Sequence, residues 1–246
     1  MSGRHGEVHA QRGDHQHADH QYADHQHADH QHGDGPEDGA TSGAFWDERY
    51  RSSSTLWSGE ANPQMVTEAS HLSPGSALDV GCGEGADAIW LAERGWRVTA
   101  VDVSTVALER GVVHAHNVGA EVAQRITWLH ADLVEWVPSA ASYDLVSAQF
   151  MHLPKVQREV LHGRLAGSVA PGGTLLVVGH HPSDLQSGVP RPSVPGLLFT
   201  SSEVADSLDR GQWLIEVDEA RARQTLDPEG HATTIHDAVL KARRLS

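Results

Sequence analysis

A short glycine-rich turn is the segment of this sequence whose residue types point most directly to chemistry. Residues 79–85 read Asp-Val-Gly-Cys-Gly-Glu-Gly and continue the apolar run at 77–78. Gly81, Gly83 and Gly85 carry no side chain, so the backbone can turn sharply and come close to a bound ligand. A helix that begins directly afterwards would add free backbone N–H groups. The turn therefore predicts a cradle for a nucleotide-like ligand.

Asp102 is a second candidate binding group, because it ends the next predicted strand at 97–102. In open parallel sheets, ligands bind outside the carboxyl ends of the strands, where a carboxylate can accept hydrogen bonds from both ribose hydroxyls. As a strand-end carboxylate, Asp102 is expected at the surface rather than in the core.

The spacing of the glycines separates two classes of cofactor. A dinucleotide fingerprint reads G-x-G-x-x-G and holds a pyrophosphate at the helix N-terminus, whereas this turn reads G-x-G-x-G. Asp79 and Glu84 place negative charge where a pyrophosphate would need none, and acidic residues suit an aminoacyl cofactor that carries a sulfonium. A dinucleotide-dependent oxidoreductase is therefore disfavoured.

Four motifs resemble those of the class I S-adenosylmethionine-dependent methyltransferases, over about 45–245. In chain order they are Leu78-Asp-Val-Gly-Cys-Gly-Glu-Gly85, Val101-Asp102-Val-Ser104, His130-Ala131-Asp132-Leu133 and Ala170-Pro-Gly-Gly-Thr174. The resemblance implies S-adenosyl-L-methionine as cofactor and methyl transfer to a small-molecule acceptor at sulfur, nitrogen, oxygen or a metalloid. Within the family, the segments at 45–50, 56–59 and 62–63 look like the tellurite-resistance and thiopurine-methyltransferase-like branch.

The same resemblance implies a role for individual residues. Asp79 and the backbone of Gly81 would face the methionine end of the cofactor, Asp102 the ribose, Val103 an adenine face and Asp132 the adenine edge. Two simpler roles stay open, since Asp79 could stabilise the turn and Asp132 could cap a helix. The predicted cofactor-binding residues are Trp57, Asp79, Gly81, Gly83, Gly85, Asp102, Val103, Asp132, Leu133 and Gln149.

Methyl transfer requires no general base, because a sulfonium already activates the transferred carbon and alignment with exclusion of water supplies much of the catalysis. By the resemblance, the segment 149–152 would lie between cofactor and acceptor. For an acceptor that must lose a proton, His152, His180 or His181 could take it, since histidine titrates near neutral pH. These histidines could equally line the cavity passively. The loop at 180–195 is rich in Pro, Ser and Gly and is long enough to act as a lid.

Alternating strand and helix patterns predict the scaffold. Expected strands lie at 77–81, 97–102, 126–129, 143–148, 174–178, 213–220 and 233–240, with helices at 45–50, 63–71, 86–94, from 105, 155–170 and from Ser201 or Ser202 to 208. This alternation predicts an α/β, doubly wound, mostly parallel seven-stranded sheet with helices on both faces, a Rossmann-like methyltransferase fold, over 44–246.

Residues 1–43 form a separate segment that is expected to be disordered, because it holds almost no large apolar side chains. A five-residue unit such as Asp-His-Gln-His-Ala repeats within it. Imidazoles and carboxylates at this density could bind a divalent zinc, nickel or copper ion. A metal-binding protein that acts through this tail is therefore the alternative function. The candidate ligands are His15, His17, His20, His25, His27, His30 and His32.

Composition limits the classes of molecule that the protein is expected to bind. A net charge of -15 opposes binding to phosphate backbones, so nucleic acid is a poor substrate. No apolar run approaches the roughly 20 residues that a membrane span needs, and a signal-peptide core is absent, which predicts a cytoplasmic protein without a membrane partner. The single cysteine, Cys82, excludes an intramolecular disulfide and is expected to act as a packing residue.

Overall fold

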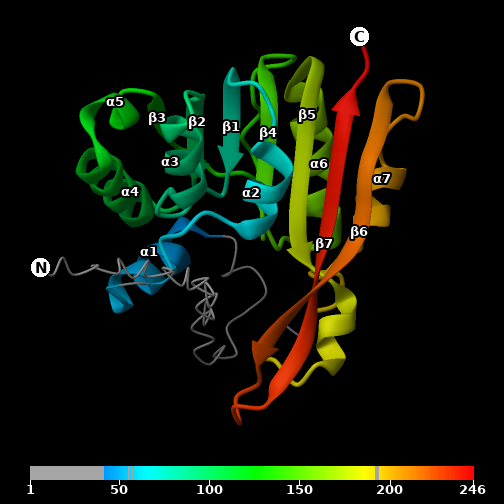
Figure 1. Ribbon diagram of the computed structural model, residues 1–246. Coiled ribbons are helices and arrows are strands. Elements are labelled where there is room, and N and C mark those ends of the chain that lie inside the picture. Colours follow the sequence, from blue (N-terminus) through cyan, green and yellow to red (C-terminus); the bar gives the residue numbers. More distant parts are fainter. Residues whose placement is uncertain (1–41, 55, 57, 192–193) are drawn as a thin grey trace, which may run out of the picture.

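The computed structural model describes residues 42–54, 56, 58–191 and 194–246, and its centre is one twisted sheet (Figure 1). Within these residues the sheet has seven strands in the order β3-β2-β1-β4-β5-β7-β6. All neighbours pair in parallel except β7, which is antiparallel to β5 and to β6. The strands are β1 Ser76–Val80, β2 Arg97–Asp102, β3 Ile126–His130, β4 Tyr143–Gln149, β5 Val169–His180, β6 Trp213–Leu226 and β7 Ala232–Arg244.

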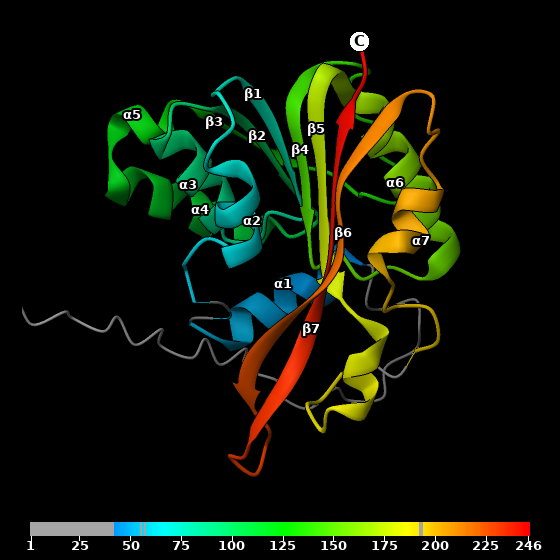
Figure 2. The same ribbon diagram turned by 45° about the vertical axis from the view of Figure 1, so that its right-hand side comes forward.

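Helices cover both faces of this sheet, as predicted (Figure 2). On one face α3 packs against β1 and β2 and α2 packs against β5, with Met65 and Leu91 fully buried. On the other face α6 covers β4 and β5, and α7 covers β6 and β7, with Leu161 and Val204 in the shared core. The helices are α1 Gly43–Ser52, α2 Pro63–Ala69, α3 Ala86–Glu93, α4 Thr105–Val118, α5 Ala120–Ala123, α6 Lys155–Ser168 and α7 Ser201–Asp206, with a 3₁₀ helix, η2, at Pro182–Gln186.

Local capping explains where most helices begin. The side chain of Asn62 accepts a hydrogen bond from the Gln64 amide at the start of α2, and Ser104 does the same for Ala107 in α4. The predicted cap of α7 is wrong, because Thr200 rather than Ser201 or Ser202 accepts the Glu203 amide. Threonine caps a helix by the same chemistry, so the start moves by one residue.

The last two strands extend much further than predicted. They pair from Trp213 opposite Arg244 to Leu226 opposite Ala232, with one register shift between Ile215 and Val217, whereas the pairing of β7 with β5 ends at Asp237 opposite His180. The outer part of the β6–β7 hairpin therefore projects beyond the carboxyl edge of the parallel strands (Figure 1). It forms a wall beside the edge where parallel sheets bind ligands.

No helix among the described residues combines the length and the apolar character that crossing a bilayer would require.

Candidate functional site

The glycine turn after β1 is packed so tightly that two of its glycines have no substitute. Gly81 has φ +70°, and a Cβ there would lie 2.0 Å from the sulfur of Met151. Gly85 has φ +84°, and a Cβ there would lie 2.3 Å from the ring of Trp128. The amide of Gly81 donates to the carbonyl of Val101 at 2.8 Å, which fixes the turn onto β2. The turn is thus a rigid surface at the carboxyl edge of the sheet, as predicted.

Asp102 connects this turn to the start of α4. Its Oδ2 accepts the Gly83 amide and its Oδ1 accepts the Ser104 amide, both at 2.8 Å. Burial raises the pKa of Asp102, while these hydrogen bonds and the charge of His130 oppose the rise. The side chain is 8% exposed, so the expectation of a surface carboxylate is wrong. Asp102 both shapes the site and borders it.

Asp79 holds the clearest unmet bonding capacity in the site. It is 2% exposed, the Ala88 amide of α3 bonds to it, and its Oδ2 has no hydrogen-bond partner. Burial, followed by the charges of Asp87 and Asp102, raises its pKa well above the ordinary value. Buried polar atoms are seldom left unsatisfied in native proteins. The free oxygen therefore marks a place for a donor group of a ligand.

Asp87 is a member of this cluster that sequence reasoning missed. It lies in the first turn of α3, and its Oδ1 accepts the Asn62 amide at 2.7 Å. Burial raises its pKa to about 6. An acidic residue in the helix turn that follows the glycines was the available signal. The partner amide lies 25 residues earlier in the chain, which no local pattern reveals.

Glu84 does not contribute free charge to the cradle, contrary to the sequence interpretation. It forms an ion pair with Arg110 of α4 at 2.9 Å. Arg110 also donates to the carbonyls of Tyr50 and Ser53, so the pair fastens α1 to α4. The acidic groups that lie behind the turn are Asp79, Asp87 and Asp102 instead.

The predicted adenine side is built from the segments after β2 and β3. The carbonyl of Val103 lies 3.0 Å from Nε2 of His130, and Gly43 of α1 lies so close that a Cβ there would be 2.7 Å from this carbonyl. Asp132 is exposed, and its Oδ1 accepts the Val134 amide. It therefore caps a turn and not the helix that the sequence interpretation considered, and it is exposed to solvent.

For two other predicted cofactor-binding residues, the structure gives Leu133 a place in the core and does not describe Trp57. Leu133 is 5% exposed and packs in the hydrophobic core, which gives it a structural role. Trp57 lies outside the described residues, as do the tail histidines His15, His17, His20, His25, His27, His30 and His32.

The carboxyl end of β4 meets the glycine turn at the predicted border between cofactor and acceptor. Gln149 donates through Nε2 to the Ser147 hydroxyl at 2.8 Å, and its buried Oε1 has no partner. Phe150 has φ +54°, which is unfavourable for a residue with a side chain. Backbone strain of this kind persists only where the surroundings enforce it, and it is concentrated at functional sites. The strained turn places Met151 against Gly81.

Of the three histidines considered as bases, His152 and His181 use a ring nitrogen to fix the backbone. Nε2 of His152 accepts the His180 amide at 3.1 Å, and the two rings stack at 4.8 Å. Burial, followed by the charges of Arg191 and Arg158, lowers the pKa of His152 to about 4, so it is neutral at pH 7. Nδ1 of His181 accepts the Ser183 amide at the start of η2. When neutral, His181 therefore carries its proton on Nε2 and can donate there.

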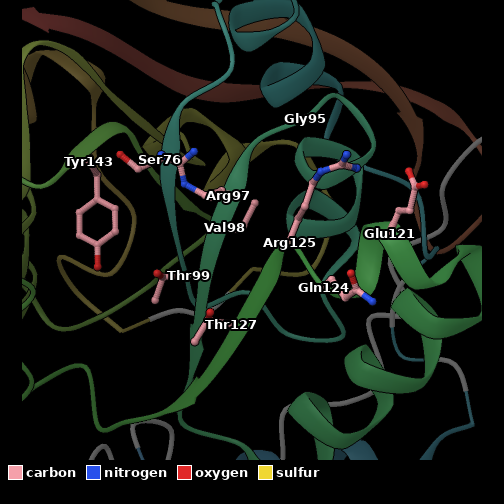
Figure 3. Close-up of a pocket in the computed structure, with 10 residues that line it drawn as sticks. All are labelled: Ser76, Gly95, Arg97, Val98, Thr99, Glu121, Gln124, Arg125, Thr127 and Tyr143. Carbon is pink, nitrogen blue, oxygen red and sulfur yellow. The ribbon is translucent and has the colours of Figure 1, made fainter.

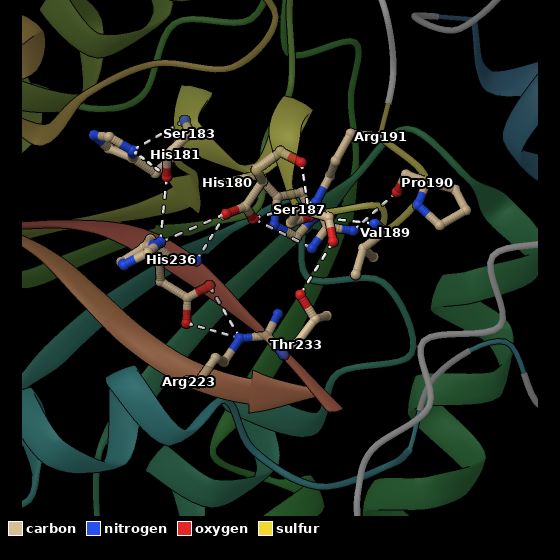
Figure 4. Close-up of polar contacts among 12 residues, drawn as sticks. His180, His181, Ser183, Ser187, Val189, Pro190, Arg191, Arg223, Thr233 and His236 are labelled. Atoms are coloured by element: carbon tan, nitrogen blue, oxygen red, sulfur yellow. Dashed lines mark hydrogen bonds and ion pairs between the residues drawn. The ribbon is translucent and has the colours of Figure 1, made fainter. Parts of the chain in front are cut away.

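The loop predicted as a lid is anchored to the projecting hairpin over its described part, 181–191 (Figure 4). Asp184 is 1% exposed and accepts the His236 amide at 2.8 Å. Arg191 pairs with the same carboxylate, and the Thr233 hydroxyl donates to the Ser187 carbonyl. These bonds make the segment a fixed wall rather than a lid.

A pocket of about 650 Å³ lies at the opposite end of the sheet, around the amino ends of β1, β2 and β3 (Figure 3). The segment 131–142, which connects β3 to β4, contains turns but no helix. Thr99 and Thr127 on this side are therefore not covered by a helix. The side chains that line the pocket point in different directions and do not converge on a common point. It is lined by Ser76, Gly95, Arg97, Val98, Thr99, Glu121, Gln124, Arg125, Thr127 and Tyr143.

Comparison with known proteins agrees with the geometry. The family model described as a methyltransferase domain matches residues 77–173, from β1 to the turn within β5. Residues 77–173 are a methyltransferase domain. The sheet order and the glycine turn give this domain the class I, S-adenosylmethionine-dependent type of fold.

Similar proteins place this methyltransferase domain in context. An uncharacterized methyltransferase of Mycobacterium tuberculosis is 40% identical over 113 residues, which are 46% of this chain and 54% of that protein. The match thus spans about half of the relative. The structure of TehB from Haemophilus influenzae aligns with a TM-score of 0.59 at 18% identity, over 82% of this chain and 66% of TehB. The structure of the 1,6-didemethyltoxoflavin-N1-methyltransferase of Burkholderia thailandensis aligns with a TM-score of 0.60 at 20% identity. The alignment covers 90% of this chain and 95% of that enzyme.

Proposed function

We propose that the protein binds S-adenosyl-L-methionine at the carboxyl edge of the sheet and transfers its methyl group to a small-molecule acceptor. The observation that carries this proposal is the buried Asp79 carboxylate, whose Oδ2 has no partner beside the rigid glycine turn. A cofactor with an ammonium group would satisfy that oxygen. The structure of the 1,6-didemethyltoxoflavin-N1-methyltransferase contains bound S-adenosylhomocysteine, which supports the same cofactor.

Each residue of the site then has a task. The Gly81 turn would lie against the methionine part, Asp79 would accept from its ammonium group, and Asp102 would accept from the ribose hydroxyls with the lone pairs that Gly83 and Ser104 leave free. The bound cofactor supplies a methyl carbon activated by a sulfonium. The wall formed by 181–191 and the β6–β7 hairpin would hold the acceptor in line and exclude water.

The acceptor is proposed to be a good nucleophile without first losing a proton to a base of the protein. His152 is neutral and fixed by the β5 backbone, and His181 offers a donor rather than an acceptor at Nε2. A thiolate, an unprotonated nitrogen or a metalloid anion meets this condition, whereas an alcohol does not. Membership of the tellurite-resistance and thiopurine-methyltransferase-like branch and a cytoplasmic location both remain predictions.

Calorimetric titration of the full chain tests the cofactor proposal. We expect micromolar binding of S-adenosylhomocysteine and no binding of NADH. Asp102→Asn should weaken the first by roughly tenfold or more, because the amide keeps an oxygen but places a donor against the Gly83 or Ser104 N–H. The conservative Asn variant is preferable to Ala, since Asp102 is buried and holds two turns. Equal affinity of Asp102→Asn and the wild type would remove the ribose assignment.

Metal binding by the histidine tail is proposed as a separate and secondary property, because His and Asp alternate at high density in residues 14–32. The Ser42 hydroxyl caps α1 by accepting the Phe45 amide, so a truncation should stop at residue 41. Zinc titration of the full chain and of 42–246 would then compare proteins with the same folded part. Equal zinc affinity in the two would dismiss the tail as a metal site.

A further inference from the structure

Three acidic side chains converge behind the glycine turn, each from a different element. Asp79 comes from β1, Asp87 from the first turn of α3, and Asp102 from the end of β2. Asp102 has both oxygens bonded to backbone amides, and Asp87 has one. Only Asp79 retains a buried oxygen that no donor meets. The cluster is therefore built to hold negative charge, and one position in it lacks compensation.

The surroundings of Asp79 offer no cation from the described part of the protein. Beyond the two acids, the turn contributes the thiol of Cys82, whose pKa is raised by burial and then by Asp79 and Asp102. The neighbouring strand β4 contributes the neutral Ser147 opposite Asp79, and Gln149 two residues on. Arg110, which reaches the turn from α4, is already paired with Glu84. In the free protein, burial and the charges of Asp87 and Asp102 raise the pKa of Asp79 and so favour its protonated form.

We propose that Asp87 is a positioning residue for the cationic end of the cofactor, acting through Asp79, and that cofactor binding at this cluster releases a proton to solvent. The inference rests on the proposed function. Asp87 places its charge beside Asp79 and keeps that carboxyl protonated until a ligand ammonium replaces the proton. The O–H bond of Asp79 breaks, the proton goes to the buffer, and the ammonium donates to the vacated carboxylate.

The position of Asp87 suits this task. The N-terminus of α3 favours a negative charge in its first turn, so Asp87 ionises more readily than Asp79 and at about pH 6. Its bond from the Asn62 amide holds the side chain in place. An asparagine there would keep that bond through its amide oxygen and remove only the charge. Asp87→Asn therefore separates the electrostatic role from the structural one.

The experiment is calorimetric titration of the full chain with S-adenosylhomocysteine from pH 5.5 to 8.5, in two buffers of different ionisation enthalpy. The difference between buffers gives the number of protons released. We expect the wild type to release a proton near neutral pH. Asp87→Asn should release fewer protons there and bind about fivefold more weakly at pH 8.5, because a nearby charge that attracts the ammonium is gone.

A matched control is Asp144→Asn, which removes one carboxylate at the amino end of the sheet, where Asp144 accepts the Ser76 amide and hydroxyl. It should match the wild type in both readouts, because the acidic cluster behind the glycine turn is unchanged. Binding without proton release in the wild type, or unchanged release and affinity in Asp87→Asn, overturns the inference and leaves the proposed function standing. No binding to the wild type would instead overturn the proposed function.

Discussion

Gly81 is the residue where backbone geometry and ligand access depend on each other most closely. Its φ is positive, and a Cβ there would lie 2.0 Å from the sulfur of Met151, so a side chain has no room. Gly81→Ala should lower the free energy of unfolding by about 1–3 kcal/mol. It should also abolish binding of S-adenosylhomocysteine, because relief of the clash moves the turn or Met151 into the cradle. Chemical denaturation and titration measure the two effects.

A comparison of the single variant Gly81→Ala with the double variant Gly81→Ala/Met151→Ala separates the steric clash with Met151 from the backbone strain at a positive φ. Shortening Met151 removes the clash and leaves the φ requirement, so the double variant should regain part of the lost stability. If the double variant is no more stable than Gly81→Ala, the contact with Met151 does not explain the glycine.

Residue-level reasoning from the sequence succeeded where one short segment carries the whole signal. The glycine turn, with Asp79 before it, and Asp102 at a strand end are local patterns, and the structure brings them together at one edge. Asp87 and the pairing of Glu84 with Arg110 depend on contacts between distant segments. The same holds for the buried state of Asp102, which follows from the packing of α1 and α4 above it.

At the level of elements, Asp47 holds the first half of α1 over the site, while Arg110 holds its C-terminal end. Asp47 accepts the hydroxyl of Ser104 at 2.7 Å, that of Thr105 at 3.1 Å and the amide of Val106 at 3.2 Å, all at the N-terminus of α4. Asp47→Ala should therefore detach α1, with a loss of roughly 1–3 kcal/mol in stability and weaker cofactor binding. Faster amide hydrogen exchange in 43–52 than in α6 would demonstrate the detachment.

The pH dependence of this contact has a defined sign. Burial alone would raise the pKa of Asp47, but the bonds from Ser104, Val106 and Thr105 outweigh it and lower the pKa below 3.8. The contact is thus fully present above the unfolded pKa and is lost only as pH falls through the lower folded value. The protection factors of the α1 amides, which correct for the pH dependence of intrinsic exchange, should be the same at pH 5 and pH 7. Marked loosening of α1 at pH 5 would contradict this assignment of Asp47.

Element boundaries were predictable from the sequence where a local cap sets them and not where pairing sets them. Asn62 and Ser104 begin helices at the expected residues. The β6–β7 hairpin runs to Leu226 and Ala232 because each strand finds its partner along its whole length, beyond the edge of the parallel sheet. Alternating polar residues there gave no apolar run to mark a strand.

For the whole molecule, buried ionisable groups act with opposite signs at mildly acidic pH. Burial lowers the pKa of His152 and of His162 from 6.5 to about 4, so the folded state binds fewer protons than the unfolded chain, and stability rises with pH between these values. Burial raises the pKa of Asp87 from 3.8 to about 6 and raises that of Asp79 well above 3.8. The contribution of these carboxyls is full below the unfolded value and is lost as pH rises.

Only the carboxyl contribution is expected to respond to the cofactor, because a bound ammonium replaces the proton on Asp79 whereas His162 lies in the core beside Phe199. Thermal stabilisation by S-adenosylhomocysteine should therefore be larger at pH 8 than at pH 5.5, with affinity rising by up to about tenfold per pH unit while Asp79 is protonated. His162→Gln should flatten the acid side of the stability curve of the free protein and leave the pH dependence of the ligand-induced shift unchanged. A ligand-induced shift that is equal at both pH values in the wild type would show that Asp79 does not exchange its proton for the cofactor.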